Sequence, residues 1–286
     1  MTIQLRAAAP SDAEACGGIM FKAFEAIARE HGFTPDFPSA EAAAGLAANL
    51  IGNPAVFGVV AEQAGRIVGS NFMSETDAIR GVGPITVDPA VQGRGVGRRL
   101  MQEVIERAGA KSGVRLLQDA FNMRSYGLYA SLGFEVREPV LVMTGRPAGK
   151  PAPGGRVRVL TLTDLDSCAE LSRRVLGVSR RQDLVDALGN LSPLVAERDG
   201  SITGYMTAPT FWIANHGIGE TDEDLRNLIL SAAESSDSVS FLLPTRQSAL
   251  LRWCLDQGLR AVKPMTLMSL GEYRRPSGAY MPSVFY

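Results

Sequence analysis

The sequence has few of the residues from which metal centres and disulfide frameworks are built. It contains three cysteines, Cys16, Cys168 and Cys254, and two histidines, His31 and His216, in 286 residues. Three cysteines so far apart are too few for a disulfide framework, and neither histidine stands in the HExxH spacing of zinc enzymes. We therefore expect no histidine-rich metal site and no disulfide-bonded scaffold.

An excess of one charge and a long apolar run are missing as well. The chain has 29 Lys and Arg residues against 30 Asp and Glu residues, a formal net charge of −1. Because nucleic-acid-binding domains present a basic face, this balance argues against that class. No apolar run approaches the ~18 residues of a membrane span, and the first residues lack the pattern of a secretion signal. We expect a cytoplasmic globular enzyme or binding protein that acts without nucleic acid or a membrane.

The length leaves room for about two domains. Residues 144–156 read TGRPAGKPAPGGR, with three prolines, four glycines and no apolar periodicity. Such a composition cannot bury a face and is typical of a linker. We therefore expect a domain at residues 1–145, a linker at 146–155 and a second domain at 156–286.

The two halves of the chain resemble each other in sequence. Residues 5–16 match 157–168 at an offset of 152, residues 61–69 match 196–204 at 135, and residues 133–143 match 258–268 at 125. Three matches in the same order indicate a tandem duplication, in which the second copy has become shorter.

Local patterns predict an α/β fold for each copy, a mixed sheet with helices on both faces. In the first copy, alternation and turn residues predict strands at about 3–7, 56–63, 66–74, 83–88, 114–119 and 135–142. Helical periodicity and cap residues predict helices at about 13–30, 40–51, 97–108 and 123–132.

The segment between the fourth predicted strand and the third predicted helix carries the most specific chemical signal. Residues 92–97 read QGRGVG, and three glycines in five positions let the backbone turn tightly. Loop amides and the free N–H groups of the helix would meet at one point, where the helix dipole favours an anion. Neither the Walker pattern nor the GxGxxG dinucleotide pattern fits, so another pyrophosphate ligand is expected, with Arg94, Arg98 and Arg99 adding charge.

The motif Gln92-Gly93-Arg94-Gly95-Val96-Gly97 resembles the Q/R-x-x-G-x-G/A acyl-CoA loop of the GCN5-related N-acetyltransferase (GNAT) family. The order of the predicted elements is similar too, including LYASLGF at residues 128–134. The resemblance covers residues 3–143, and residues 157–270 resemble the same fold without the loop. It implies two tandem GNAT domains, the second of them degenerate, and acetyl-CoA as co-substrate with no metal.

The resemblance also implies roles for individual residues. Tyr129 would protonate the leaving thiolate, and Asn122 would contact the cofactor. The other cofactor-binding residues would pair with the pantetheine arm or hold the pyrophosphate: Ile85, Thr86, Val87, Gln92, Gly93, Arg94, Gly95, Val96, Gly97, Arg98 and Arg99. Taken alone, Tyr129 is also explained by core packing and Asn122 by capping a helix.

The reaction expected from the resemblance moves an acetyl group to a primary amine by direct attack in a ternary complex, at one active site in the first domain. The amine must lose a proton, and Glu75, Asp77 and Asp119 near strand ends are the candidate bases. A chain without a broad acidic face favours a small-molecule amine as acceptor substrate. Two alternatives stay open: transfer of a longer acyl group, and a non-catalytic acyl-CoA sensor.

The second copy lacks the chemistry of the first. Gln247 stands at the position of Asn122 and Cys254 at that of Tyr129, and acidic residues within 220–224 replace the pyrophosphate loop. We expect this domain to bind no CoA, and to serve stability, a homodimer or the wall of the first domain's pocket. The aromatic-rich tail at residues 274–286 either folds back across the acceptor side of the first domain or is frayed.

Overall fold

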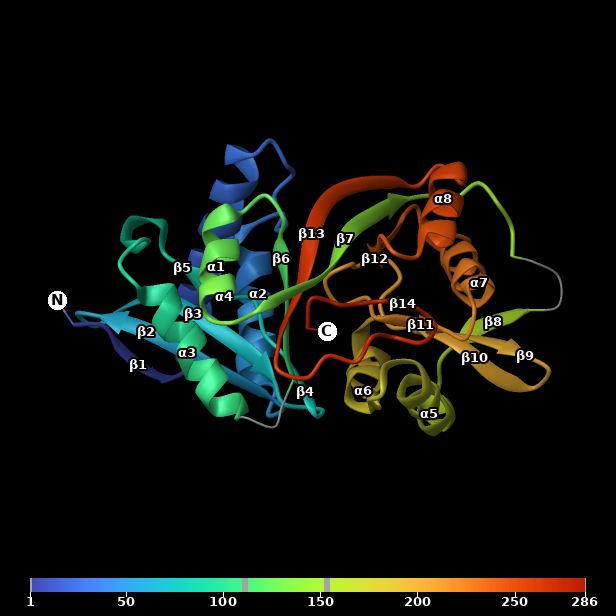
Figure 1. Ribbon diagram of the computed structural model, residues 1–286, viewed down its shortest axis with the longest axis horizontal. Coiled ribbons are helices and arrows are strands. Elements are labelled where there is room, and N and C mark those ends of the chain that lie inside the picture. The colour runs from blue at the N-terminus through green and yellow to red at the C-terminus, as the bar shows by residue number, and fades with distance from the viewer. Residues whose placement is uncertain (1, 110–112, 152–154, 286) are drawn as a thin grey trace. The chain divides into compact units, whose positions relative to one another are not determined.

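The computed structural model describes residues 2–109, 113–151 and 155–285 (Figure 1). The contacts within the chain divide it into two compact units. Unit 1 runs to Glu135 and adds Met268–Glu272, and unit 2 comprises Val136–Leu267 and the described residues from Tyr273 onward. In the described residues, no helix is both long and apolar enough to cross a bilayer.

Unit 1 contains a four-stranded antiparallel sheet with the strand order β1-β2-β3-β5. Its strands are β1 (Gln4–Ala7), β2 (Val56–Gln63), β3 (Arg66–Ser74) and β5 (Thr86–Val87). The predicted turn between β2 and β3 is confirmed, with Ala64 and Gly65 both at positive φ. A further pair of strands, β4 (Ile79–Gly81) and β6 (Gly113–Asp119), is parallel.

The strand predicted at residues 83–88 is confirmed only at Thr86–Val87, which form β5 and pair with β3. A separate short strand, β4 at Ile79–Gly81, precedes it and pairs with β6. Pro84 lies between the two strands and has no amide hydrogen to donate to a ladder. β5 and β6 belong to different sheets, and the site described below lies between β5 and the end of β6.

The helices of unit 1 agree with the prediction to within a residue or two. They are α1 (Ala13–Glu30), α2 (Ala40–Gly52), α3 (Val96–Ala108) and α4 (Met123–Ser131). The face of α3 formed by Leu100, Met101 and Val104 is buried, as its periodicity predicts. Met101 and Val104 share a core cluster with Phe134 and Met268.

Unit 2 repeats this plan. Its first sheet has the order β14-β11-β10-β9-β8 and consists of β8 (Arg156–Val159), β9 (Leu194–Arg198), β10 (Ser201–Met206), β11 (Gly217–Gly219) and β14 (Ala279–Met281). The helices are α5 (Leu165–Leu176), α6 (Arg181–Asn190), α7 (Asp222–Ala232) and α8 (Ser248–Asp256). The remaining strands are β7 (Glu135–Gly145), β12 (Val239–Pro244) and β13 (Arg260–Leu270).

The division by contacts differs from the expected boundary at residues 146–155. β7 pairs antiparallel with β12 from Val140 to Gly145, and Met143 belongs to the core of unit 2. β13 in turn contributes Met268–Leu270 to unit 1. Each unit therefore uses a strand that the linear boundary assigns to the other. The described part of the expected linker has no helix or strand, and residues 152–154 lie outside the described residues.

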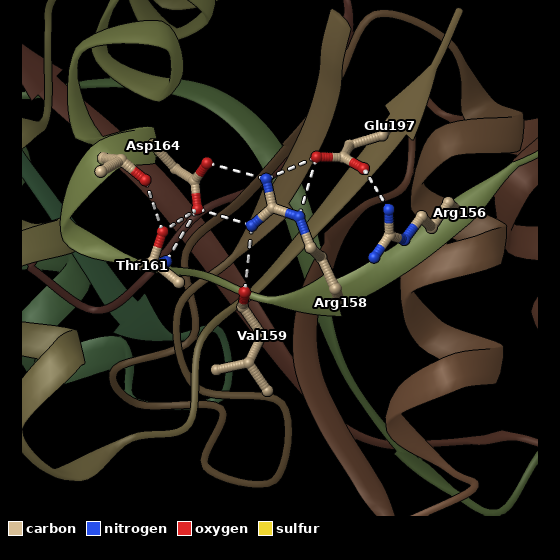
Figure 2. Close-up of polar contacts among 7 residues, drawn as sticks. Arg156, Arg158, Val159, Thr161, Asp164 and Glu197 are labelled. Carbon is tan, nitrogen blue, oxygen red and sulfur yellow. Dashed lines mark hydrogen bonds and ion pairs between the residues drawn. The ribbon is translucent and has the colours of Figure 1, made fainter. Parts of the chain in front are cut away.

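The duplication is visible as the same polar network in both units. In unit 2, Arg158 donates to both carboxylate oxygens of Asp164, at 2.7 and 2.8 Å, and also to Glu197 (Figure 2). In unit 1, Arg6 makes the same contacts with Asp12, at 2.7 and 2.9 Å, and with Glu62. The aligned positions thus hold equivalent side chains, and the sequence repeat is a structural repeat.

Candidate functional site

Unit 1 contains a cavity of about 530 Å³ between β5 and the end of β6. Its lining comes from α1, β5, the loop that follows β5, the start of α3, the end of β6 and α4. Of the predicted site residues, those that line it are Ile85, Thr86, Val87, Gln92, Gly93, Gly95, Val96, Gly97, Arg98, Asn122 and Tyr129. The fold therefore brings together residues from three separate stretches of sequence.

The glycine loop enters α3 without any side-chain cap. Gly93 and Gly95 have φ of +79° and +81°, and Gly95 is the N-cap residue of α3. Only glycine adopts this conformation at no steric cost, and the first N–H groups of a helix have no partner inside it. The loop thus leaves an uncapped, positively polarised helix end at the cavity, which is the geometry of an anion site.

Two side chains connect this loop to its surroundings. Gln92 donates from Nε2 to the Val87 carbonyl of β5 at 3.0 Å, and Arg124 of α4 donates to Oε1 of Gln92. Arg124 also lines the cavity. Arg124 could not be predicted from the sequence, because it lies 32 residues from Gln92 and no local motif connects the two.

Two of the predicted arginines do not line the cavity. Arg99 donates to the Ile3 carbonyl at 2.7 Å, and Arg94 is absent from the lining. Arg98 lines the cavity and donates to the Ser131 hydroxyl at 2.6 Å. Consecutive helical residues point in different directions, so the sequence pattern alone could not separate Arg98 from Arg99.

Tyr129 of α4 lines the cavity. Its side chain is buried, with its ring 6.1 Å from that of Phe134. Burial, together with the nearby charge of Asp119, raises the pKa of Tyr129 above its usual value. The phenol therefore keeps its proton at neutral and moderately alkaline pH. Tyr129 therefore both packs in the core and contacts the cavity.

Asp119 is the one candidate base among the three that lines the cavity. Glu75 pairs with Arg107 at 3.0 and 3.1 Å, which lowers the pKa of Glu75 and makes it a poorer base. Asp77 accepts from the amide of Ala78 in its own loop. Asp119 is buried at the end of β6. Asn122 accepts from the Ser125 amide at 3.1 Å and so caps α4, as expected.

An aromatic group forms another wall of the cavity. The Phe121 ring stacks on Phe33 with centroids 4.3 Å apart and lies 5.1 Å from the His31 ring. His31 and Phe121 both line the cavity, together with Phe24 and Ile27 of α1. No local pattern in the sequence indicates that Phe121 lies beside His31, because the two residues are far apart in the chain.

Among the described residues, no group of three or more His, Cys, Asp or Glu side chains is arranged to hold a metal ion. The three cysteines are free and buried, and burial raises the pKa of the Cys16 thiol to about 11. A thiol of this kind is not a ready nucleophile.

Comparison with known proteins connects this geometry to a family. Residues 54–136 match the family model described as an acetyltransferase (GNAT) domain. These residues include β2, β3, the glycine loop, α3, β6 and α4. A search of curated proteins finds no match to the sequence.

Solved structures of the same fold cover nearly the whole chain. A proposed acetyltransferase from Pyrococcus horikoshii has a TM-score of 0.79 at 17% identity, over 99% of this chain and 94% of that one. A GCN5-related N-acetyltransferase from Sphaerobacter thermophilus has a TM-score of 0.61 at 17% identity, over 96% of both chains. A tandem GNAT protein from the clavulanic acid biosynthesis pathway has a TM-score of 0.59 at 13% identity, over 94% of this chain and 98% of that one.

Residues 54–136 thus match the model of a GNAT domain, and the chain has the fold seen in tandem GNAT proteins. The family connects the protein with acyl transfer in general. The glycine loop and Tyr129 lie inside the matched segment, and α1 contributes further lining residues from outside it.

Proposed function

We propose that unit 1 is an N-acetyltransferase that uses acetyl-CoA and acts on a small-molecule primary amine. The observation that carries the proposal is the cavity bordered by β5, by the uncapped start of α3 and by a buried tyrosine. The glycine loop supplies backbone amides for a pyrophosphate, and Arg98 and Arg124 supply charge. These groups fit the phosphates and the extended arm of an acyl-CoA.

The proposed mechanism uses few side chains. Acetyl-CoA supplies the acyl group as a thioester. The neutral amine attacks the thioester carbon, so that a C–N bond forms and the C–S bond breaks. Tyr129 donates its phenolic proton to the departing sulfur, and Asp119 accepts the proton that the amine loses. Backbone N–H groups of β5 polarise the carbonyl oxygen.

The acceptor substrate is proposed to bind against the aromatic wall. Phe24, His31 and Phe121 give this part of the cavity an apolar, aromatic character. Such a surface favours a compact amine with an apolar or aromatic body over a polyamine, whose several charges would lose water there.

Calorimetric titration with acetyl-CoA tests the cofactor site. Gly95→Glu should abolish binding, because it puts a side chain at a position with φ of +81° and a negative charge beside a phosphate site. Gly65→Glu is the matched control, since its φ is +75° and it lies in the β2–β3 turn away from the cavity. Equal affinities for Gly95→Glu and wild type would refute the site.

A panel of primary amines then separates an enzyme from a sensor. Turnover with a member of the panel, monitored by release of free thiol, supports the transferase. Tight acetyl-CoA binding without turnover on any amine would instead identify an acyl-CoA-binding module. The same assay with acyl-CoAs of increasing chain length gives the donor preference.

A further inference from the structure

The short strand β11 of unit 2 holds the place that β5 holds in unit 1. In unit 1, Gly69 of β3 pairs with Val87 of β5, and in unit 2 Gly204 of β10 pairs with Gly219 of β11. Gly69 and Gly204 are matched positions of the sequence repeat. It follows that β11 corresponds to Ile85–Val87, which line the cavity of unit 1.

The free side of β11 is covered by the C-terminal strand β14, as Figure 1 shows. The two strands pair antiparallel, with Gly217 opposite Met281, Ile218 opposite Tyr280 and Gly219 opposite Ala279. Ala279 and Met281 are part of the core of unit 2. Residues 279–281 are therefore not frayed. They lie against β11 on the side that corresponds to the cavity beside β5 in unit 1.

Gln247 fixes this peptide by its main chain. Its side chain donates to the Tyr280 carbonyl at 2.6 Å and accepts from the Tyr280 amide at 2.9 Å. Gln247 is the N-cap residue of α8, as Asn122 is of α4. Gln247 is thus the counterpart of Asn122, the proposed cofactor contact of unit 1, and it binds both the amide and the carbonyl of Tyr280.

Further polar contacts hold both sides of the strand. The Tyr280 hydroxyl donates to buried Glu138, which also pairs with Arg246 at 2.8 Å. The amide of Ser277 donates to the Val175 carbonyl at 2.9 Å. Beyond β14, the Val284 amide donates to the Ile213 carbonyl, and Arg180 donates to the Ser283 hydroxyl.

Unit 2 has at the same time lost the part that would receive phosphate. Val96, which begins α3, follows Val87 by nine positions, whereas Asp222, which begins α7, follows Gly219 by three. Thr221 caps α7 and Asp224 bonds back to the Thr221 amide at 2.9 Å. The N-terminus of α7 thus follows a short loop, is capped by a side chain and carries acidic residues. These features disfavour the binding of an anion there.

We infer that unit 2 retains the strand-binding half of a duplicated acyl-CoA cleft and that its ligand is the chain's own C-terminal strand. The peptide main chain pairs with β11 and Gln247 in place of an acyl-CoA arm. The description of the cleft as an acyl-CoA cleft rests on the proposed function of unit 1, whereas the pairing of β14 with β11 does not depend on it. One consequence is that the chain binds a single acyl-CoA.

A designed disulfide tests the pairing of β14 with β11 in the full-length protein. A Cβ built on Gly217 lies 3.6 Å from the Cβ of Met281, within the range of natural disulfides. Gly217→Cys with Met281→Cys should cross-link under mild oxidation and melt several degrees higher than its reduced form. Met281→Cys alone is the control, and the native cysteines are buried. A pair that stays reduced in the folded protein overturns the inference.

Gln247→Ala tests the clamp without truncating the chain. The change leaves the Tyr280 amide and carbonyl without their partner, and we expect the Tm to fall by about 5 °C. Hydrogen exchange at residues 279–281 should accelerate at least tenfold. Gln182→Ala is the control, because Gln182 is exposed and its amide donates to Asp186 on the same helix, α6. Equal exchange in both variants contradicts the clamp.

Acetyl-CoA titration separates this inference from the proposed function. Two acetyl-CoA molecules per chain, one of them surviving Gly95→Glu, would overturn the inference. A chain that binds no acetyl-CoA would refute the proposed function of unit 1. The cross-link and the exchange rates would still test whether β14 pairs with β11.

Discussion

Tyr129 combines a structural and a chemical role in one side chain. Because it is buried, the phenylalanine variant should keep the packing against Phe134 and lose only the hydroxyl. We expect Tyr129→Phe to lower kcat by about 10²-fold and to leave the acetyl-CoA Kd within about twofold. Steady-state kinetics and calorimetry on the same preparation measure both. An unchanged kcat would remove Tyr129 from the mechanism.

The raised pKa of Tyr129 gives this residue a distinct pH signature. A group whose pKa is raised keeps its proton to higher pH, so its acid function persists beyond the usual range of tyrosine. The wild-type kcat should therefore show no decline from loss of this proton up to about pH 10. A pH–rate profile that falls with an apparent pKa of about 9 and loses this limb in Tyr129→Phe would contradict the raised pKa of Tyr129.

Arg124 and Arg99 form a natural pair of test and control. Arg124 lines the cavity and holds Gln92, whereas Arg99 donates to the Ile3 carbonyl. Arg124→Ala should weaken acetyl-CoA binding by at least about tenfold, since it removes a charged donor near the phosphates. Arg99→Ala should change the Kd by less than about twofold. The opposite order of effects would favour the sequence-based assignment of Arg99.

At the scale of elements, the repeated arginine network ties the first strand of each unit to its first helix. In unit 2, Arg158 holds the pKa of Asp164 well below its usual range by hydrogen bonding. A carboxyl with a depressed pKa contributes stability above the ordinary carboxyl pKa, and that contribution disappears as the pH falls. The protein should therefore lose stability progressively below about pH 4.

Asp164→Asn isolates this contribution. We expect a loss of about 2 kcal/mol in the free energy of unfolding at pH 7, because charge-assisted hydrogen bonds are lost. The loss should begin to shrink towards pH 3, because the carboxyl of the unfolded chain takes up its proton there while that of the folded protein stays ionised. Thermal melts between pH 7 and pH 3 measure this, with Asp237→Asn as control, since the Asp237 side chain is fully exposed. A pH-independent difference would refute the explanation.

At the scale of the whole molecule, the division into units changes which fragment can fold. A fragment of residues 157–286 lacks β7, which pairs with β12 and supplies Met143 to the core of unit 2. We expect a fragment of residues 136–286 to unfold cooperatively and the 157–286 fragment to show no cooperative transition. Circular dichroism melts of both fragments decide this. A cooperative transition in the shorter fragment would show that β7 is dispensable.

The sequence by itself determined the local features of this protein. The β2–β3 turn, the extent of α3 and the glycine loop follow from residue periodicity and from the freedom of glycine, which act over a few neighbouring residues. The duplication was visible as well, because matched residues such as Arg6 and Arg158 keep their order in the chain.

Only the tertiary structure decided which distant segments meet. It placed Arg124 and Phe121 at the cavity, limited the strand predicted at 83–88 to Thr86–Val87, gave β7 to unit 2 and paired β14 with β11. Strand pairing and side-chain contact join residues far apart in the chain, and the energy of such a pairing depends on the whole packed core. No local pattern encodes that choice, so it is made only when the chain folds.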